Sequence, residues 1–256
     1  VYVGSEHIRR VLAEVVGPVE RVEEVPPGVD VEEFRPAPRA EALAALLEEA
    51  HLDPPNPGNA NERFPDESNA ERLAAFLADE QPTVLYFGKL IRNKGVHVLL
   101  EALRGLDVRA VIVGFGDYRD ELEALAPART LFTGPLEHRH LRHLLPLADV
   151  AVVPSIFPEA FGMVAAEAAS AGTPPLVARH SGLAEVAAGI EAEYPPEHAD
   201  LAGFVSGDAA DLTAKLRRLL ALDPADRRAL GTAARRAVVA RWSWERVAER
   251  LLSAHG

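Results

Sequence analysis

TVLYFG, residues 83–88, is the first of five short apolar runs that decide the fold of this chain. The others are RAVIVG at 109–114, TLFTG at 130–134, DVAVVPS at 149–155 and PPLVA at 174–178. Each run is rich in β-branched or aromatic residues, and a stretch of helical character separates it from the next. Such alternation is typical of a parallel sheet buried on both faces. We therefore predict an α/β fold, a doubly wound, Rossmann-like parallel sheet that binds ligands at the carboxyl ends of its strands.

The spacing of apolar residues also places the helices. We expect them at 95–104, 117–125, 137–145, 161–171 and 183–188, with three C-terminal helices at 208–220, 224–240 and 243–252. Before the sheet, the sequence predicts a strand end and then a helix capped by Ser5. Two small helices at 40–49 and 69–78 flank a loop at 51–68 that is rich in Pro, Asn and Gly.

Composition excludes several classes of protein. The 256 residues are 48% hydrophobic, too many for a disordered chain, and the net charge of −12 argues against a nucleic acid or an anionic membrane as partner. Without cysteine the chain has no disulfide, thiol nucleophile or thiolate metal site. No apolar run approaches the ~18 residues of a membrane span and no signal peptide opens the sequence, so we expect a cytoplasmic protein.

A basic cluster follows the first strand. Most of the net negative charge lies in the first eighty residues, so the rest of the chain can present a local cationic pocket. Two of the three lysines, Lys89 and Lys94, fall in GKLIRNKG (88–95). Gly88 would let the backbone approach a ligand, Gly95 would open the next helix, and the lysines would lie where a diphosphate could bind. The alternative is a solvated basic turn.

A second constellation, PSIFPEAFGMVAAEAASAG (154–172), follows the fourth strand. Its loop carries Glu159, and a helix that starts near Phe161 would direct the free N–H groups of 162–164 at an anion. From Glu159 to Glu167 a helix advances ~12 Å, which suits two carboxylates at opposite ends of an extended ligand. It does not suit an acid and a base ~5–9.5 Å apart across one bond. Alternatively, Glu159 caps the helix and Glu167 is a surface residue.

Two further motifs have less specific interpretations. VGFGDYR (113–119) follows a strand, but Arg119 occupies the place of the third glycine of a dinucleotide fingerprint, so we expect a tight βα turn. His138, His140 and His143 lie beside Glu137 and could bind a metal. Because no supporting hydrogen-bond partners can be recognised in the sequence, we favour a solvated helix start.

The two constellations, in this order, resemble the donor-nucleotide domain of GT-B glycosyltransferases, specifically family 4 (group 1). Residues 88–95 match the family motif G-[RK]-L-x-x-x-K-G, and Glu159 with Glu167 matches its E-x7-E signature. Family members more often have arginine where Lys89 stands, a difference that keeps the charge but loses bidentate geometry. Supporting matches are VPPGVD (25–30) with Phe34, VGFG (113–116), FTG (132–134) and WSWE (242–245).

The resemblance implies a catalytic set of Glu159, Lys89 and Lys94, in which the lysines neutralise the diphosphate as charge develops on the leaving group. It implies a donor-binding set of Gly88, Gly134, Leu136, Glu137, Phe161, Gly162, Met163, Val164 and Glu167. Glu167 would hold the ribose hydroxyls, the loop 134–137 would pack on the base, and Glu159 with the amides of 161–164 would hold the sugar and phosphate. The family retains the anomeric configuration without a metal, so we expect no cofactor and a UDP-, GDP- or ADP-linked sugar as substrate.

The resemblance also implies how the chain is divided. GT-B enzymes have two Rossmann-like domains with the active site between them, and only the donor-binding one matches here. We expect 1–36 to be a remnant of the interdomain segment with the strand that leads into the domain. Residues 37–80 would be a helical and loop insertion and 81–256 the donor-nucleotide domain, with the acceptor domain before residue 1.

On this interpretation the chain is the donor half of a retaining hexosyltransferase that is inactive by itself. Two alternatives stay open: a non-catalytic module that binds nucleotide sugars, and a GT-B-like nucleotide-sugar epimerase. A glycan phosphorylase would carry a pyridoxal-phosphate lysine deep in this domain, and Lys215 is poorly placed for that.

Overall fold

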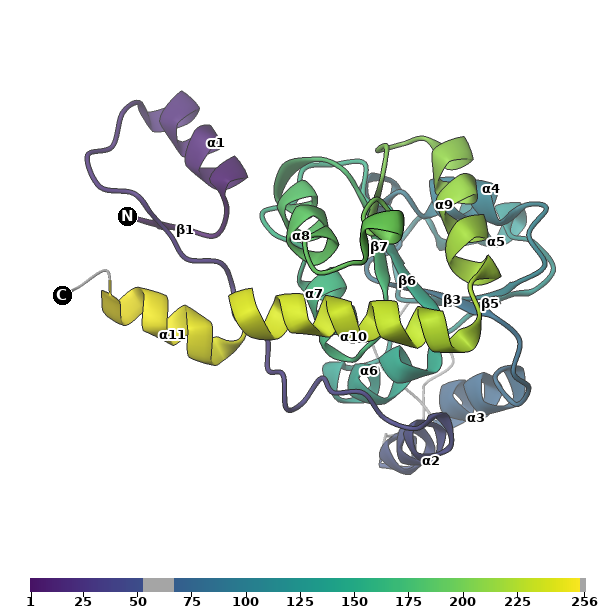
Figure 1. Cartoon of the computed structure of the whole chain (residues 1–256). Helices are drawn as coiled ribbons and strands as arrows, with labels where there is room; N and C mark the ends of the chain where they lie inside the picture. The colour runs from purple at the N-terminus through teal and green to yellow at the C-terminus, as the bar shows by residue number, and fades with distance from the viewer. Residues whose placement is uncertain (53–66, 254–256) are drawn as a thin grey trace.

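A six-stranded parallel sheet forms the centre of the protein (Figure 1). The computed structural model describes residues 1–52 and 67–253. The strand order is β5-β4-β3-β6-β7-β8, and every neighbouring pair is parallel. The strands are β3 (Thr83–Phe87), β4 (Arg109–Val113), β5 (Thr130–Phe132), β6 (Val150–Val153), β7 (Pro175–Ala178) and β8 (Gly203–Phe204). The predicted doubly wound sheet and its five predicted strands are confirmed; β8 was not predicted, because two residues carry no recognisable pattern.

Every predicted helix is present, with ends shifted by a few residues. The helices are α1 (Glu6–Val16), α2 (Arg39–Ala50), α3 (Glu67–Phe76), α4 (Val96–Leu103), α5 (Arg119–Leu125), α6 (His138–Leu144), α7 (Met163–Ser170), α8 (Ser181–Glu191), α9 (Ala209–Ala221), α10 (Pro224–Arg241) and α11 (Trp244–Ser253). The largest difference is α8, which extends beyond the predicted 183–188 at both ends. Of the predicted loop at 51–68, residues 53–66 lie outside the described residues.

Two groups of helices cover the sheet. Helix α4 packs against α5 and α9, and α10 packs against α7 and α8 (Figure 1). The strand order reverses between β3 and β6, so right-handed crossovers on the two sides of this point place their helices on opposite faces. Between these layers the strand side chains are buried, Val84, Val111 and Leu176 completely.

The N-terminal residues form a small unit beside the sheet domain (Figure 1). In it, β1 (Tyr2–Val3) and β2 (Glu23–Glu24) pair in parallel, joined by α1. The carboxylate of Glu185 on α8 accepts hydrogen bonds from the amides of Glu6 and His7 at 3.0 and 2.9 Å, which satisfies the start of α1. Further along, Val29 forms a parallel bridge with Ser243 at the junction of α10 and α11. The family matches VPPGVD (25–30) and WSWE (242–245) therefore lie side by side.

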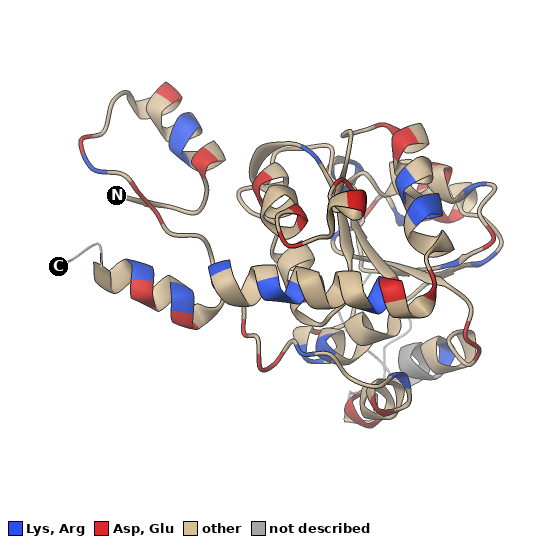
Figure 2. Cartoon of the chain, viewed as in Figure 1, with Lys and Arg blue, Asp and Glu red and all other residues tan. Residues whose placement is uncertain are grey.

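Charge is distributed unevenly over these elements. Figure 2 shows acidic residues on α1, on β2, on the segment that follows β2 and on α2. Glu49 near the end of α2 pairs with Arg139 and Arg142 of α6, so part of this acidity is neutralised by the domain it packs on. None of the described helices is long and apolar enough to cross a membrane.

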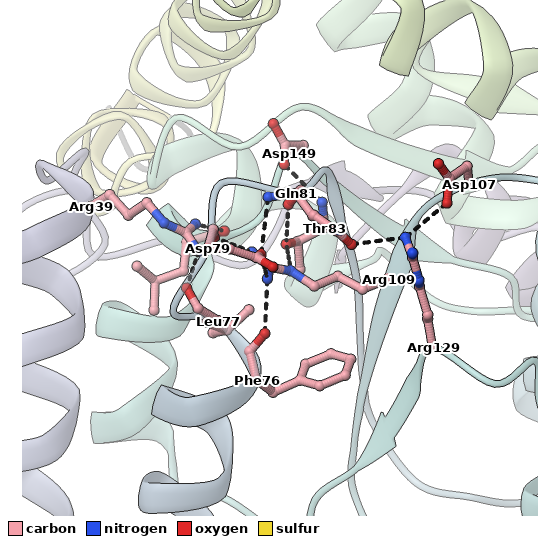
Figure 3. A network of polar contacts seen from close by, with 11 residues as sticks. Arg39, Phe76, Leu77, Asp79, Gln81, Thr83, Asp107, Arg109, Arg129 and Asp149 are labelled. Carbon is pink, nitrogen blue, oxygen red and sulfur yellow. Dashed lines mark hydrogen bonds and ion pairs between the residues drawn. The ribbon is translucent and has the colours of Figure 1, made fainter.

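A buried arginine ties α3 to the amino edge of the sheet (Figure 3). Arg109 begins β4 and is only 3% exposed. Its guanidinium donates to Thr83 Oγ1 at 2.7 Å and to the carbonyl oxygens of Phe76 and Asp79 at 2.8 Å each, and it pairs with the Asp79 carboxylate. Arg39 on α2 donates to the same Asp79 carbonyl at 3.1 Å. The two arginines thus fasten α2 and the end of α3 to the sheet.

Arg109→Met should lower the free energy of unfolding by about 3 kcal/mol, because it leaves buried acceptors without a donor. Arg129 on the same edge is the matched control: it pairs with Asp107 at 2.7 Å, but its side chain is 51% exposed. Arg129→Met should therefore cost less than about 1 kcal/mol. Urea unfolding of both variants measures the difference, and equal losses would contradict the assignment.

Candidate functional site

Two adjoining cavities lie at the carboxyl edge of the sheet. The first, of about 560 Å³, is lined by the connection after β3 and by the loop between β6 and α7. The second, of about 580 Å³, is lined by the ends of β3 and β4 and by the loop before α6. Phe87, Gly88 and Lys89 belong to both. The first cavity lies between β3 and β6, where the strand order reverses and where doubly wound sheets bind ligands.

Both predicted lysines reach the first cavity. Lys94 ends a short 3₁₀ turn, and its Nζ donates to Glu159 Oε1 at 2.6 Å. Gly95 then opens α4 with φ 68°, and a Cβ there would lie 1.9 Å from the carbonyl oxygen of Pro154, so only glycine fits. Lys94 is therefore not a solvated residue of a basic turn, which was the alternative interpretation of this segment. Arg92 does fit that alternative, because it pairs with Glu121 on the surface.

Helix α7 begins at the wall of the first cavity. Gly162 is its N-cap, and Gly162, Met163 and Val164 line the cavity together with Phe161. The first-turn amides of a helix have no partner within it, so an anion here would meet N–H groups and the positive end of the helix dipole. The helix begins two residues later than predicted, at Met163. Glu159 does not cap this helix, so that alternative is wrong.

Glu167 is buried inside the wall formed by α7. It is 5% exposed, which makes the surface-residue alternative wrong. Its Oε1 lies 3.6 Å from Nε2 of His138, which lines the second cavity. Burial raises the pKa of Glu167 to about 7, and repulsion from Glu33 adds to this rise. Glu167 is not among the described residues that line the two cavities. It lies behind His138, which does line the second cavity.

The loop before α6 forms the outer wall of the second cavity. Leu136 and Glu137 line it, whereas Gly134 is buried and accepts a hydrogen bond at its carbonyl from Thr133 Oγ1 at 2.7 Å. The structure thus brings eleven of the twelve candidate residues to or directly beside the two cavities, with Gly134 behind the wall: Gly88, Lys89, Lys94, Leu136, Glu137, Glu159, Phe161, Gly162, Met163, Val164 and Glu167. Their roles in binding stay predictions.

The three histidines of this region do not converge. His140 is fully buried, and its Nδ1 accepts the amide hydrogen of Glu137 at 3.1 Å. Our expectation of a solvated helix start is therefore wrong for His140, because this ring closes the first turn of α6. His138 faces Glu167, and His143 lies 3.9 Å from Glu49. Within residues 1–52 and 67–253 no group of three acidic or histidine side chains could hold a metal ion.

Sequence reasoning missed two residues of the site. His138 was considered only as a metal ligand, and nothing in the sequence indicates that it faces Glu167 from another helix. Tyr86 was assigned only to a strand, yet its hydroxyl donates to the carbonyl oxygen of Lys89 at 2.8 Å and so fixes the backbone of that lysine. Burial raises the pKa of the Tyr86 hydroxyl, which keeps it protonated as a donor.

The fold and the site define a GT-B glycosyltransferase domain. Residues 68–237 match the family of Glycosyl transferases group 1, and the chain belongs to this family. It is similar to the D-inositol 3-phosphate glycosyltransferase of Xylanimonas cellulosilytica, with 32% identity over 254 residues that cover 93% of this chain and 51% of that protein. The chain thus spans about half the length of that relative.

Solved structures have the same fold. The sucrose-phosphate synthase of Thermosynechococcus elongatus superposes with a TM-score of 0.73 and 27% identity, covering 99% of this chain and 57% of that one. Anabaena HepE, crystallised with UDP-glucose, superposes with a TM-score of 0.72 and 20% identity, covering 98% of this chain and 63% of that one. The matched part is 57% of the first of these chains and 63% of the second.

Glu167→Gln should stabilise the protein above pH 7 and leave its stability unchanged below pH 4.5. Because the pKa of Glu167 rises from 4.5 to about 7 on folding, the folded state binds more protons than the unfolded state between these values. Stability therefore falls as the pH rises through this window. Glutamine does not ionise, so Glu167→Gln avoids this loss in the free energy of unfolding, which reaches about 3 kcal/mol above pH 7.

Thermal unfolding of the wild type and Glu167→Gln at pH 4.5 and 8 measures this effect. Glu48→Gln is the control, because Glu48 is an exposed glutamate on α2. A Glu167→Gln difference that is the same at both pH values would show that burial does not raise the pKa.

Proposed function

We propose that this chain binds a nucleotide-diphosphate sugar and is the donor-binding part of a retaining glycosyltransferase. Lys89, Lys94 and the start of α7 converge on one cavity at the reversal of strand order, and this convergence supports the proposal. Two ammonium groups and free helix amides complement a diphosphate. Both cavities fall within the ~300–1,000 Å³ of small-molecule sites, which leaves room for sugar and nucleoside on either side of the diphosphate.

In the proposed reaction the bond between the anomeric carbon and the diphosphate oxygen breaks, a hydroxyl oxygen of the acceptor bonds to the anomeric carbon, and the hydroxyl proton goes to the departing diphosphate. Negative charge then develops on the departing diphosphate, where Lys89, Lys94 and the α7 amides would stabilise it. Lys94 would exchange its Glu159 partner for a phosphate oxygen, which leaves the Glu159 carboxylate free to accept hydrogen bonds from sugar hydroxyls. By family resemblance, the anomeric configuration is retained and no metal is required.

The nucleoside would occupy the second cavity. The loop 134–137 would pack on the base, and Glu167 would accept hydrogen bonds from the ribose hydroxyls. The complex of HepE with UDP-glucose supports a nucleotide sugar as the ligand class. Uridine, guanosine and adenosine diphosphates share the diphosphate that Lys89 and Lys94 are proposed to bind, so all three are candidates.

The acceptor would be held elsewhere. We propose that it binds to a further domain outside these 256 residues, in keeping with the matched length of the relatives, and that this chain alone transfers no sugar. We also propose that the whole protein is a cytoplasmic hexosyltransferase. Binding without transfer by the whole protein would instead favour the non-catalytic module.

Calorimetric titration with UDP-glucose, GDP-mannose and ADP-glucose should show saturable binding of at least one of them. Lys89→Met and Lys94→Met should each weaken that binding about 10–100-fold, because each removes a charge-assisted contact with the diphosphate. The third lysine is the matched control: Lys215 lies on α9 and pairs with Asp200, so Lys215→Met should leave the affinity unchanged. Equal affinities for all three variants and the wild type would count against the proposed site.

A further inference from the structure

We propose that Ser181 and His180 are positioning residues that fix Glu159 relative to the sugar of the donor. The inference rests on the proposed function and concerns the loop between β6 and α7. Neither residue is among the described lining residues of the two cavities, since His180 is the N-cap of α8 and Ser181 is its first residue. They would therefore act through Glu159 and not on the substrate.

Ser181 has an unusual backbone conformation. Its φ is 48°, and among the described residues other than glycine it has the single positive φ. A side chain in the left-handed region costs free energy that glycine would not incur. Such strain is typical of positions where the side chain is needed for function.

The strained conformation places the Ser181 hydroxyl against the loop of Glu159. The amide of Glu159 donates to Ser181 Oγ at 2.8 Å. Ser181 Oγ lies 2.9 Å from Nδ1 of His180, and Nε2 of His180 lies 2.6 Å from the carbonyl oxygen of Ser155. These contacts form a relay that joins both ends of the segment 155–159 to the start of α8.

The hydrogens of this relay can be assigned from its ends. A carbonyl oxygen only accepts, so Nε2 of His180 carries the ring hydrogen and donates to Ser155. In the neutral ring Nδ1 then accepts the hydroxyl hydrogen of Ser181, and the hydroxyl oxygen accepts the amide hydrogen of Glu159. Every donor in the relay has one acceptor. The hydrogen bonds therefore allow a single arrangement of the His180 ring, the Ser181 hydroxyl and the Glu159 amide.

The next residue completes the attachment of Glu159. The amide of Gly182 donates to the carbonyl oxygen of Glu159 at 2.9 Å. A Cβ on Gly182 would lie 2.3 Å from the carbonyl oxygen of Ala160, so α8 starts directly on this loop. Both peptide groups of Glu159 are thus held by Ser181 and Gly182.

Rigid attachment matters because Lys94 is proposed to leave Glu159 for the diphosphate. Without its partner at 2.6 Å, the Glu159 carboxylate would depend on its backbone for its position. The relay would keep it aimed at the sugar. Loss of the relay should therefore weaken the binding of the sugar portion and leave the nucleoside diphosphate largely unaffected.

Two substitutions of Ser181 separate the hydroxyl from the strain. Ser181→Ala loses the hydroxyl and keeps the strain, whereas Ser181→Gly loses both. Each should lower the affinity for UDP-glucose about fivefold, the effect of about one net hydrogen bond, and change that for UDP less than twofold. Ser181→Gly should melt at or above the temperature of Ser181→Ala, because it relieves the strain. If the wild type prefers guanosine or adenosine ligands, GDP-mannose with GDP or ADP-glucose with ADP replaces this pair.

The control residue, Asp208, is not among the described lining residues of either cavity. Asp208 caps α9 and accepts hydrogen bonds from the amides of Ala210 and Asp211 at 2.9 and 3.0 Å. Asp208→Ala should lower the melting temperature without changing the ratio of the two dissociation constants. His180→Phe removes both ring nitrogens and should reproduce the fivefold loss for the nucleotide sugar.

Hydrogen exchange tests the relay without any ligand. In Ser181→Ala and Ser181→Gly, the amide of Glu159 should exchange several-fold faster than in the wild type, because its acceptor is gone. Failure of the wild type to bind any nucleotide sugar would overturn the proposed function. With wild-type binding intact, unchanged exchange, or equal losses for the nucleotide sugar and the nucleoside diphosphate, would overturn this inference alone.

Discussion

The parallel pairing of β3 with β6 is the constraint on which the rest of the structure depends. Val84 lies opposite Val150 and Leu85 opposite Ala151, so the two strands end at the same edge of the sheet. The chain leaves them for helices on opposite faces, which opens a crevice between the connections. GKLIRNKG (88–95) follows one strand and the Glu159 loop the other. Segments about seventy residues apart in the sequence, Lys94 and Glu159 among them, therefore meet at one cavity.

The proposed diphosphate site belongs to a chain of net charge −12. Lys89, Lys94 and the amides of α7 are brought together on one side of the sheet, while many acidic residues lie on α1, β2 and α2 (Figure 2). Glu137 and Glu159 line the same cavities, so the formal charges of the lining balance and the net negative charge lies elsewhere on the chain. Glu167 is buried behind this site, which is why its pKa rises.

The two edges of the sheet are built differently. At the amino edge the buried Arg109 guanidinium has backbone and hydroxyl acceptors in favourable geometry, and the network secures α2 and α3 (Figure 3). At the carboxyl edge Ser181 adopts a strained backbone, and its hydroxyl accepts from the Glu159 amide. The Arg109 network at the amino edge thus stabilises the fold. At the carboxyl edge the strained Ser181 costs some of that stability, and its hydroxyl is proposed to hold Glu159 in place.

The sequence by itself determined five of the six strands of the central sheet, the helices and the neighbourhood of the lysines and Glu159, because apolar periodicity reports local burial and connections after parallel strands share one edge. Only the tertiary structure decided the burial of Glu167 and His140, the contact of His138 with Glu167 and the relay from Ser181 to Glu159. These depend on side chains from different helices and loops that meet within a few ångströms. No local pattern encodes such distances, since they are set by how the helices pack on the sheet.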